Sequence, residues 1–274
     1  MNANNLTVVI GAASGMGRAV AARFAADGPL LLADRSVAGL ATVEAELGRD
    51  ADVTCIPLDI TDAAAVNALV EQTGDSFSSL IITAGLSPTM GTCAQIIEVN
   101  LVGMARLLDA FTSLAVEGSV AVCLASTAGH FGIEPAVGAV LDDPSAPDLL
   151  ERLAAVSPAA LADTGMAYMA SKTGVIRLAR RTAVAWGPRG ARVVSISPGI
   201  IDTPMGAQEM AHQAMMPMMV ENTPLRRQGR AEEIAEVAHF LCSPQASFVN
   251  GCDLLVDGGS DGWVKTMMAQ AGTI

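Results

Sequence analysis

The sequence predicts an α/β fold in which a doubly wound sheet of seven mainly parallel strands carries helices on both faces. Two observations predict it: short apolar, β-branched runs recur along the chain, and Ala-rich amphipathic stretches separate them. Strands that alternate with helices require right-handed crossovers, and these produce a parallel sheet buried on both faces. Ligands of such sheets bind beyond the carboxyl ends of the strands, so the motifs at those ends matter most for function.

The expected elements follow one another in regular alternation. The strands are expected at residues 6–10, 30–33, 53–56, 80–83, 120–125, 192–196 and 253–256. The helices are expected at residues 15–26, 37–47, 62–73, 92–111, 167–186 and 231–241. Because α/β folds commonly spend this length on one sheet core, residues 1–274 are expected to form a single domain.

Two segments interrupt the alternation. Residues 134–165 are rich in Pro, Asp and Ala, and we interpret them as an insertion with a short helix near 148–155. Residues 204–224 contain six methionines. Flexible thioethers adapt to irregular apolar shapes, so this second segment is expected to be a substrate lid; a piece of core or a subunit contact fits its composition equally well.

Charge and cysteine content exclude several classes of protein. The formal net charge of −12 disfavours a nucleic-acid partner, which needs a basic face. Five cysteines without metal or disulfide spacing indicate a reducing compartment, and the three histidines are also too scattered to bind metal. The N-terminus lacks a basic signal region, and its apolar run is too short to cross a membrane. A cytoplasmic protein with no metal and no membrane partner is therefore expected.

A glycine-rich loop follows the first expected strand and opens the first helix. It comprises Gly11, Ser14, Gly15, Met16 and Gly17, in the spacing GxxxGxG. Glycines there allow a tight turn and close approach of the backbone to a pyrophosphate, and the N–H groups at the start of the helix bind the phosphates. The spacing departs from the general GxGxxG pattern, so an ordinary turn is the alternative. The strand-to-helix position favours a dinucleotide site.

Two carboxylates follow the second and third strands. Asp34 lies at the offset expected of a residue that binds the adenosine ribose, where it favours NAD(H) because it would repel the 2′-phosphate of NADP. Arg35 follows it and could bind that phosphate, and a loop-capping role for Asp34 is the alternative. Asp59 and Ile60 occupy a similar crevice position after the third strand, although Asp59 could instead support the helix start near Asp62.

The single tyrosine of the chain, Tyr168, stands four residues before Lys172 on an expected helix. Residues i and i+4 share one helix face, so the phenol and the ammonium group can meet at one ligand. A neighbouring positive charge lowers the pKa of a phenol and suits it to proton transfer. The spacing alone is a weak signal, and it gains weight from the nucleotide loop.

Together these motifs resemble the short-chain dehydrogenase/reductase family, in the family's order and over nearly the whole chain. The matching positions are Gly11 to Gly17, Asp34, Asn100, Ser126, Tyr168, Lys172, Pro198 and Gly199. The resemblance implies a Rossmann-type sheet in which Tyr168 is the general acid of carbonyl reduction. It further implies that Lys172 lowers the pKa of Tyr168 and binds the nicotinamide ribose, that Ser126 holds the substrate oxygen, and that Asn100 supports a water relay.

The resemblance also assigns further cofactor contacts. Ala84 and Gly85 are expected beside the adenosine, and the nicotinamide is expected against Pro198, Gly199, Ile201 and Thr203. The family usually has Asn where this chain has Thr83. That difference is expected to change one local hydrogen bond while leaving backbone contacts intact.

The long spacing between Ser126 and Tyr168 is similar to that of the bacterial 3α-hydroxysteroid dehydrogenase/carbonyl reductases within the family. The resemblance implies an NAD(H)-dependent enzyme that interconverts a secondary alcohol and a ketone, and a homo-oligomer, either a dimer with altered packing or a tetramer. The Met-rich segment favours a small apolar substrate, steroid-like or terpenoid. The alternatives are an NADPH-dependent 3-oxoacyl thioester reductase and a catalytically silent nucleotide-binding scaffold.

Overall fold

The computed structural model describes residues 5–48, 51–213 and 215–270. Most of the N-terminal segment from which the absence of a signal was predicted, residues 1–4, therefore lies outside the described residues, as does position 214 of the Met-rich segment. Among the described residues, no helix is both long enough and apolar enough to cross a membrane.

The central sheet has seven strands in the order β3-β2-β1-β4-β5-β6-β9, and every pairing is parallel. The strands are β1 Thr7–Ile10, β2 Leu30–Asp34, β3 Val53–Pro57, β4 Ser79–Ile82, β5 Val120–Leu124, β6 Arg192–Pro198 and β9 Asp253–Val256. The predicted doubly wound sheet is thus confirmed. Its order reverses between β1 and β4, which places the expected ligand crevice beyond the ends of these two strands.

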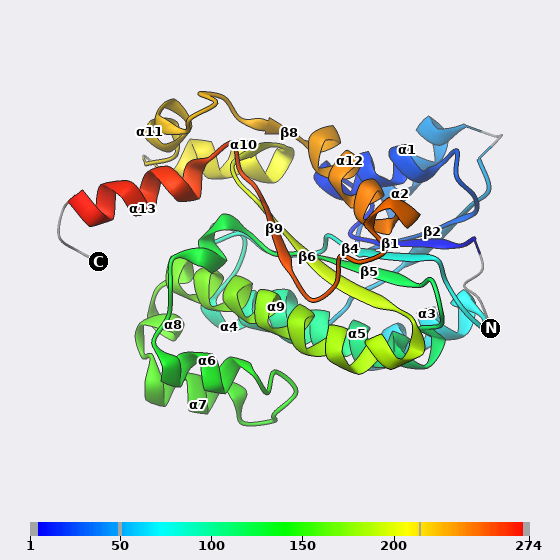
Figure 1. Ribbon diagram of the computed structural model, residues 1–274, viewed down its shortest axis with the longest axis horizontal. Coiled ribbons are helices and arrows are strands. Elements are labelled where there is room, and N and C mark those ends of the chain that lie inside the picture. The colour runs from blue at the N-terminus through cyan, green and yellow to red at the C-terminus, as the bar shows by residue number, and fades with distance from the viewer. Residues whose placement is uncertain (1–4, 49–50, 214, 271–274) are drawn as a thin grey trace.

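Helices cover both faces of the sheet (Figure 1). One layer comprises α1 Gly15–Phe24, α2 Val37–Leu47 and α12 Ala231–Cys242, and the other comprises α3 Ala63–Thr73, α5 Met104–Phe111 and α9 Thr164–Trp186. Each layer packs on the sheet through a separate apolar cluster. The larger cluster, under α9, contains the fully buried rings of Phe77, Phe111 and Trp186.

The helix expected over residues 92–111 is present as one continuous helical segment, but its hydrogen-bond pattern changes in the middle. Thr92 caps α4 Cys93–Ile97, a π-helical turn (η1) follows at Glu98–Gly103, and only then does α5 begin. Hydrophobic periodicity does not distinguish one turn with i→i+5 hydrogen bonds from an α-helical turn, so the sequence pattern did not reveal it.

The predicted insertion contains three helices, α6 Pro135–Leu141, α7 Leu149–Val156 and α8 Ala159–Ala162, at the foot of Figure 1. Both α6 and α8 pack against α9. Asp142, at the end of α6, forms ion pairs with Arg177 and Arg181 of α9. The Arg177 hydrogen bond and the two positive charges lower the pKa of Asp142. The insertion is therefore attached to the helix that carries Tyr168.

The Met-rich segment forms α10 Pro204–His212 and α11 Met215–Asn222, and α13 Ser260–Gln270 packs beside α11. Two short strands, β7 Ile201–Asp202 and β8 Gly229–Arg230, pair next to them and were not predicted. Nor was α13 predicted. Its only buried residues are Ser260 and Asp261, so it lacks the apolar stripe on which helix prediction depends. Short 3₁₀ turns complete the described chain at Thr112–Leu114, Thr127–His130 (η3), Gly187–Arg189 and Pro244–Ala246.

Candidate active site

The glycine-rich loop turns sharply between β1 and α1. Gly11 and Gly15 adopt φ values of 87° and 52°, which side chains disfavour. A Cβ atom on Gly17 would lie 2.0 Å from the carbonyl oxygen of Gly11, and one on Gly11 would lie 2.6 Å from the Ala84 nitrogen. Neither Gly11 nor Gly17 therefore has room for a side chain, and the start of α1 beside them is a position that suits a phosphate.

A cavity of about 250 Å³ opens beside this loop. Twelve of the residues predicted to bind cofactor line it: Gly11, Ser14, Gly15, Met16, Gly17, Asp34, Arg35, Asp59, Ile60, Ala84, Gly85 and Thr203. The prediction missed Leu58, Leu86, Met90, Val99, Pro204 and Met205, which also line it. Several of these follow β3 or β4, so their position at the carboxyl ends of strands was the available signal.

Asp34 ends β2 at the wall of this cavity. Its Oδ2 accepts a hydrogen bond of 3.0 Å from the Ala13 N–H, and its Oδ1 accepts one of 2.8 Å from the Ser36 N–H. The carboxylate is thus held by the glycine-rich loop and by the start of α2, and its remaining lone pairs can accept hydrogen bonds from a ribose.

Asp59 is held within its own loop. Its Oδ1 accepts hydrogen bonds from the N–H and the hydroxyl of Thr61, at 2.9 and 2.7 Å, and these bonds lower the pKa of Asp59. Asp62 caps α3. The alternative considered for Asp59, support of this helix start, is therefore present in the structure, and Asp59 also lines the cavity.

Thr83 replaces the Asn usual in the family. Its hydroxyl donates to the carbonyl oxygens of Ile10 and Gly11 at 2.9 and 3.1 Å. The side chain thus ties the chain after β4 to the glycine-rich loop.

Five predicted cofactor contacts are not among the residues that line the cavity: Tyr168, Lys172, Pro198, Gly199 and Ile201. Gly199 lies against the chain after β9, where a Cβ would be 2.7 Å from the Asp257 Cα. The Ile201 side chain is buried in the apolar cluster under α12. Any cofactor contact of Ile201 would therefore involve its backbone.

The three expected catalytic side chains meet near the carboxyl end of β5. Ser126 follows β5, and its hydroxyl is hydrogen-bonded to the phenol of Tyr168. Tyr168 and Lys172 share one face of α9, with the Lys172 Nζ 5.7 Å from the centre of the Tyr168 ring. The Nζ also donates to the Leu124 carbonyl oxygen at 2.9 Å, which joins α9 to the end of β5.

Burial changes the pKa values of both Tyr168 and Lys172. Burial raises the pKa of Tyr168 to about 12, although the hydrogen bond from Ser126 opposes the shift. Burial lowers the pKa of Lys172 to about 8. The pKa of Tyr168 is thus raised, whereas a lowered value was expected, because loss of solvation outweighs the hydrogen bond from Ser126.

Asn100 lies in the π-helical turn and is fully buried. Its side chain exchanges two hydrogen bonds with the backbone of Leu86, at 2.7 and 2.9 Å, and donates to the Ser171 hydroxyl at 3.2 Å. It therefore fastens the cavity wall after β4 to α9, one residue before Lys172.

Glu209 on α10 belongs to the same electrostatic environment and was missed. Its negative charge raises the pKa of both Tyr168 and Lys172, while burial raises the pKa of Glu209 itself. A carboxylate from the Met-rich segment thus acts electrostatically on Tyr168 and Lys172. The only available signal was an acidic residue within an otherwise largely apolar stretch. Among the described residues, no cluster of His, Cys, Asp and Glu could hold a metal ion.

Comparison with known proteins identifies the family. The short chain dehydrogenase model matches residues 5–137, and the enoyl-(acyl carrier protein) reductase model matches residues 153–261. Galactitol 2-dehydrogenase of Cereibacter sphaeroides is 33% identical over 93% of this chain and 94% of its own length. The 3α-hydroxysteroid dehydrogenase/carbonyl reductase of Comamonas testosteroni is 30% identical over 78% of this chain and 84% of its own length.

A solved structure supports the same assignment. The 3α-hydroxysteroid dehydrogenase of Pseudomonas sp. B-0831, complexed with NADH, superposes with a TM-score of 0.77 at 27% identity, covering 95% of this chain and 98% of that chain. The chain belongs to the short-chain dehydrogenase/reductase family. It is an oxidoreductase that acts on CH–OH groups with a nicotinamide cofactor.

Proposed function

We propose that this protein is an NAD(H)-dependent dehydrogenase/reductase that interconverts a secondary alcohol and a ketone at Tyr168. The observation that carries the proposal is the hydrogen bond between Ser126 and Tyr168, with Lys172 5.7 Å from the same ring, beside the glycine-lined cavity. A bound nicotinamide supplies or accepts the hydride. The side chains supply the proton and hold the reacting oxygen.

The three side chains have distinct parts in this chemistry. The Ser126 hydroxyl holds the substrate oxygen, where charge develops during reduction, and Tyr168 donates its phenolic proton to that oxygen. A pKa near 12 makes Tyr168 a protonated donor at neutral pH. In alcohol oxidation the phenolate is needed as a base, and the charged form of Lys172 stabilises it.

The preference for NAD(H) rests on Asp34. The carboxylate at the cavity wall is fixed by two backbone N–H groups, so it cannot readily turn away from a 2′-phosphate. The exposed Arg35 side chain is the one nearby group that favours NADP(H).

For the substrate we propose a small apolar ketone or alcohol, steroid-like or terpenoid, under a lid formed by α10 and α11. Pro204 and Met205, at the start of α10, line the cofactor cavity, and this supports a lid in that position. Glu209, on α10, places an acidic group close enough to act on Tyr168 and Lys172, and it would disfavour anionic substrates.

The test of the mechanism is Tyr168→Phe. The change removes the transferable proton with little loss of volume, so turnover should fall by orders of magnitude while NADH binding, followed by fluorescence titration, stays within about twofold. Wild-type turnover in a variant that binds NADH would refute the mechanism.

A substrate panel separates the remaining alternatives. Purified protein is assayed with NADH and NADPH against steroid ketones, monoterpene ketones, simple quinones and an acetoacetyl thioester. The match to an enoyl-(acyl carrier protein) reductase model favours the thioester, whereas Asp34 and the net charge of −12 favour the NADH-dependent ketone reaction. Cofactor binding without turnover of any substrate would favour the silent scaffold.

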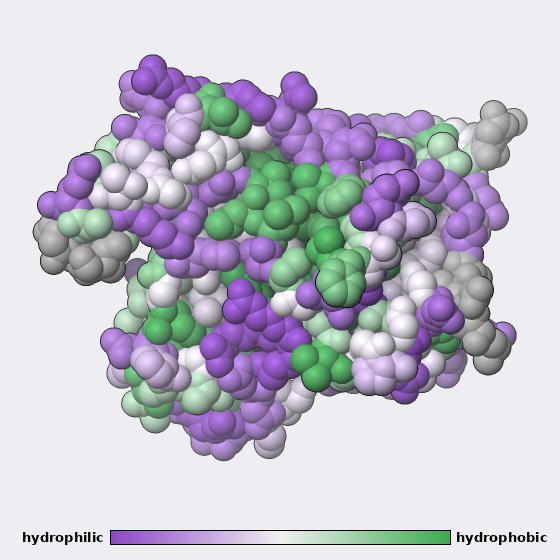
Figure 2. Space-filling model, in the orientation of Figure 1, coloured by the Kyte–Doolittle hydropathy of each residue, from purple (hydrophilic) through white to green (hydrophobic). Residues whose placement is uncertain are grey.

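We further propose a cytoplasmic homo-oligomer, a dimer or tetramer. The five cysteines are unpaired, as is usual in a reducing compartment. Strand β9 lies at the edge of the sheet, and Figure 2 shows hydrophobic side chains gathered over it. Leu254 and Leu255 of this strand are 39% and 36% exposed, and such an edge invites pairing with a second copy. Light scattering at several concentrations tests this.

A further inference from the structure

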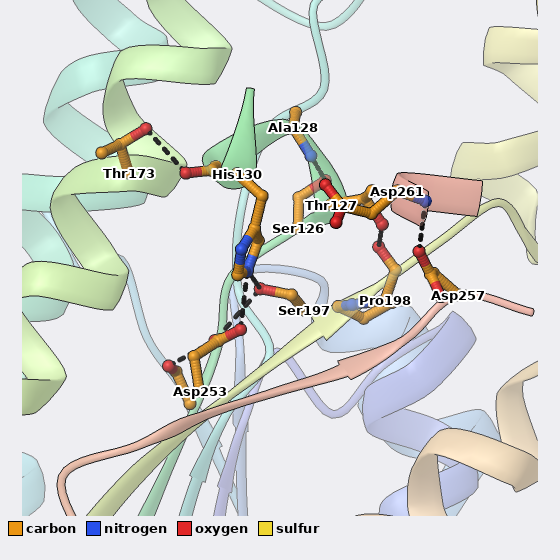
Figure 3. Close-up of polar contacts among 12 residues, drawn as sticks. Ser126, Thr127, Ala128, His130, Thr173, Ser197, Pro198, Asp253, Asp257 and Asp261 are labelled. Atoms are coloured by element: carbon orange, nitrogen blue, oxygen red, sulfur yellow. Dashed lines mark hydrogen bonds and ion pairs between the residues drawn. The ribbon is translucent and has the colours of Figure 1, made fainter. Parts of the chain in front are cut away.

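A buried polar cluster joins the catalytic segment to the edge of the sheet (Figure 3). His130 ends η3, and its Nε2 lies 2.8 Å from Oδ2 of Asp253 on β9 and 3.2 Å from the Ser197 hydroxyl. The other oxygen of Asp253 accepts hydrogen bonds from the hydroxyls of Ser195 and Ser197 on β6. The cluster therefore connects η3, β6 and β9 through side chains alone.

The Asp253 carboxylate is only 1% exposed, so its burial is costly unless donors surround it. The two serine hydroxyls and His130 satisfy it, and because a carboxylate only accepts, we assign a proton to the His130 Nε2 that faces it. The same nitrogen faces both Asp253 and Ser197. It cannot act as a base towards either serine, so the cluster does not form a nucleophilic triad.

Ser126 is the N-cap residue of this same 3₁₀ turn, η3. The Thr127 hydroxyl donates to the Pro198 carbonyl at 2.8 Å, which attaches the start of the turn to the end of β6. The Thr173 hydroxyl donates to the Gly129 carbonyl at 3.1 Å. A Cβ on Gly129 would lie 3.0 Å from the backbone of Lys172, so the turn packs directly on the catalytic helix.

The far end of the turn is where the chain leaves the sheet for the insertion. Gly132 follows with a φ of 86°, and α6 begins at Pro135. Without the His130 side chain, this end of η3 would lose its attachment to the edge strand, and Ser126 lies only four residues away.

We propose that His130 and Asp253 are positioning residues for catalysis: by fastening the end of η3 to β9, they hold the Ser126 hydroxyl where it meets Tyr168 and the substrate oxygen. The inference rests on the proposed role of Ser126. A shift of about 1 Å in a group that touches the reacting atom can cost about 100-fold in rate, so a remote anchor has a measurable effect.

The test compares kcat with NADH and the panel ketone that the wild-type protein reduces fastest. His130→Phe keeps a ring and removes the donor, and it should lower kcat about 10- to 100-fold while the Kd for NADH stays within about twofold. His130→Gln, whose amide can still donate to Asp253, should recover part of the loss. Asp253→Leu removes both acceptor oxygens at similar volume and should reproduce the His130→Phe defect.

The matched control is His239, which makes a comparable contact with Asp27 at 2.9 Å on the other face of the sheet. His239→Phe should leave kcat unchanged. The decisive measurement repeats His130→Phe in a Ser126→Ala background, where a residue that acts through Ser126 should cause no further loss.

Equal losses from His130→Phe in the two backgrounds would overturn the proposal in favour of a general structural role. Unchanged kcat in His130→Phe and Asp253→Leu proteins that bind NADH normally would overturn it as well. If Ser126→Ala itself left kcat unaltered, the proposed function of Ser126 would have failed first, and that result is distinguishable from the others.

Discussion

The charge of Asp34 should control which nicotinamide cofactor the protein binds, and Asp34→Asn tests this. The substitution retains one acceptor oxygen and the shape of the side chain, and it removes the negative charge. The carboxylate now accepts one hydrogen bond from the Ala13 N–H and one from the Ser36 N–H. An Asn side chain can accept only one of these two bonds, because an NH2 donor replaces the other oxygen.

The magnitude follows from two effects. Replacing a charged acceptor of a ribose hydroxyl by a neutral one weakens NADH binding by about 1 kcal/mol, or about fivefold. Removing a unit charge about 5 Å from a doubly charged 2′-phosphate, at the high effective dielectric of a half-exposed site, relieves about 2–3 kcal/mol of repulsion for NADPH. The ratio of the two dissociation constants should therefore shift towards NADPH by about 100- to 1,000-fold.

Calorimetric titration with NADH and NADPH measures this ratio without any need for a substrate. The matched control is Asp59→Asn, because Asp59 lines the same cavity but is bonded through Thr61. It should change both affinities together and leave their ratio unchanged. An unchanged ratio in Asp34→Asn protein would show that this carboxylate does not select the cofactor.

Three further predictions concern other parts of the molecule. Glu209→Gln removes a negative charge that raises the pKa of Tyr168, so the rise of alcohol oxidation with pH, which follows formation of the phenolate, should move to lower pH in a pH–rate profile. Gly17→Ala places a Cβ 2.0 Å from the Gly11 carbonyl oxygen and should abolish NADH binding in a fluorescence titration. Trp186→Ala removes a fully buried ring and should lower the free energy of unfolding by about 3–5 kcal/mol in urea.

Each of these predictions has a control and a contradicting result. Gly187→Ala meets no atom within 4 Å and should bind NADH normally, whereas equal binding by Gly17→Ala protein would disprove the packing argument. Val184 is 77% exposed, and its replacement by Ala should change stability by less than about 0.5 kcal/mol. If the pH–rate profile of alcohol oxidation were the same in the Glu209→Gln variant and the wild-type protein, Glu209 would not act on Tyr168.

Strand prediction succeeded for the central sheet because its strands consist mainly of apolar residues, and β1, β4 and β5 are buried at every residue. Each strand therefore stands out as an apolar run, and seven such runs occur within two residues of the observed strands. The glycine loop and the residues at strand ends were equally visible, since the chemistry there depends on local spacing. Helix α13 was not visible, because it buries almost nothing against the body of the protein.

Side-chain partnerships distant in sequence lay beyond such reasoning. His130 and Asp253 are 123 residues apart, and neither stands in a motif. The electrostatic influence of Glu209 on Tyr168 depends on where α10 lies over the sheet. The pKa of Tyr168 itself depends on the degree of its burial, which sequence spacing does not report.

The π-helical turn limits how the sequence can change in length. A π-helical turn holds one residue more than an α-helical turn, so deletion of one residue from Glu98–Gly103 would restore regular α-helix and shift the residues within the turn relative to the segments they contact. Asn100 would then lose the backbone of Leu86, or Leu101 would lose its place against Gly174 on α9. The wider turn lets consecutive residues serve the cavity wall and the core at once, and among homologous chains this segment should tolerate substitution far better than loss of a residue.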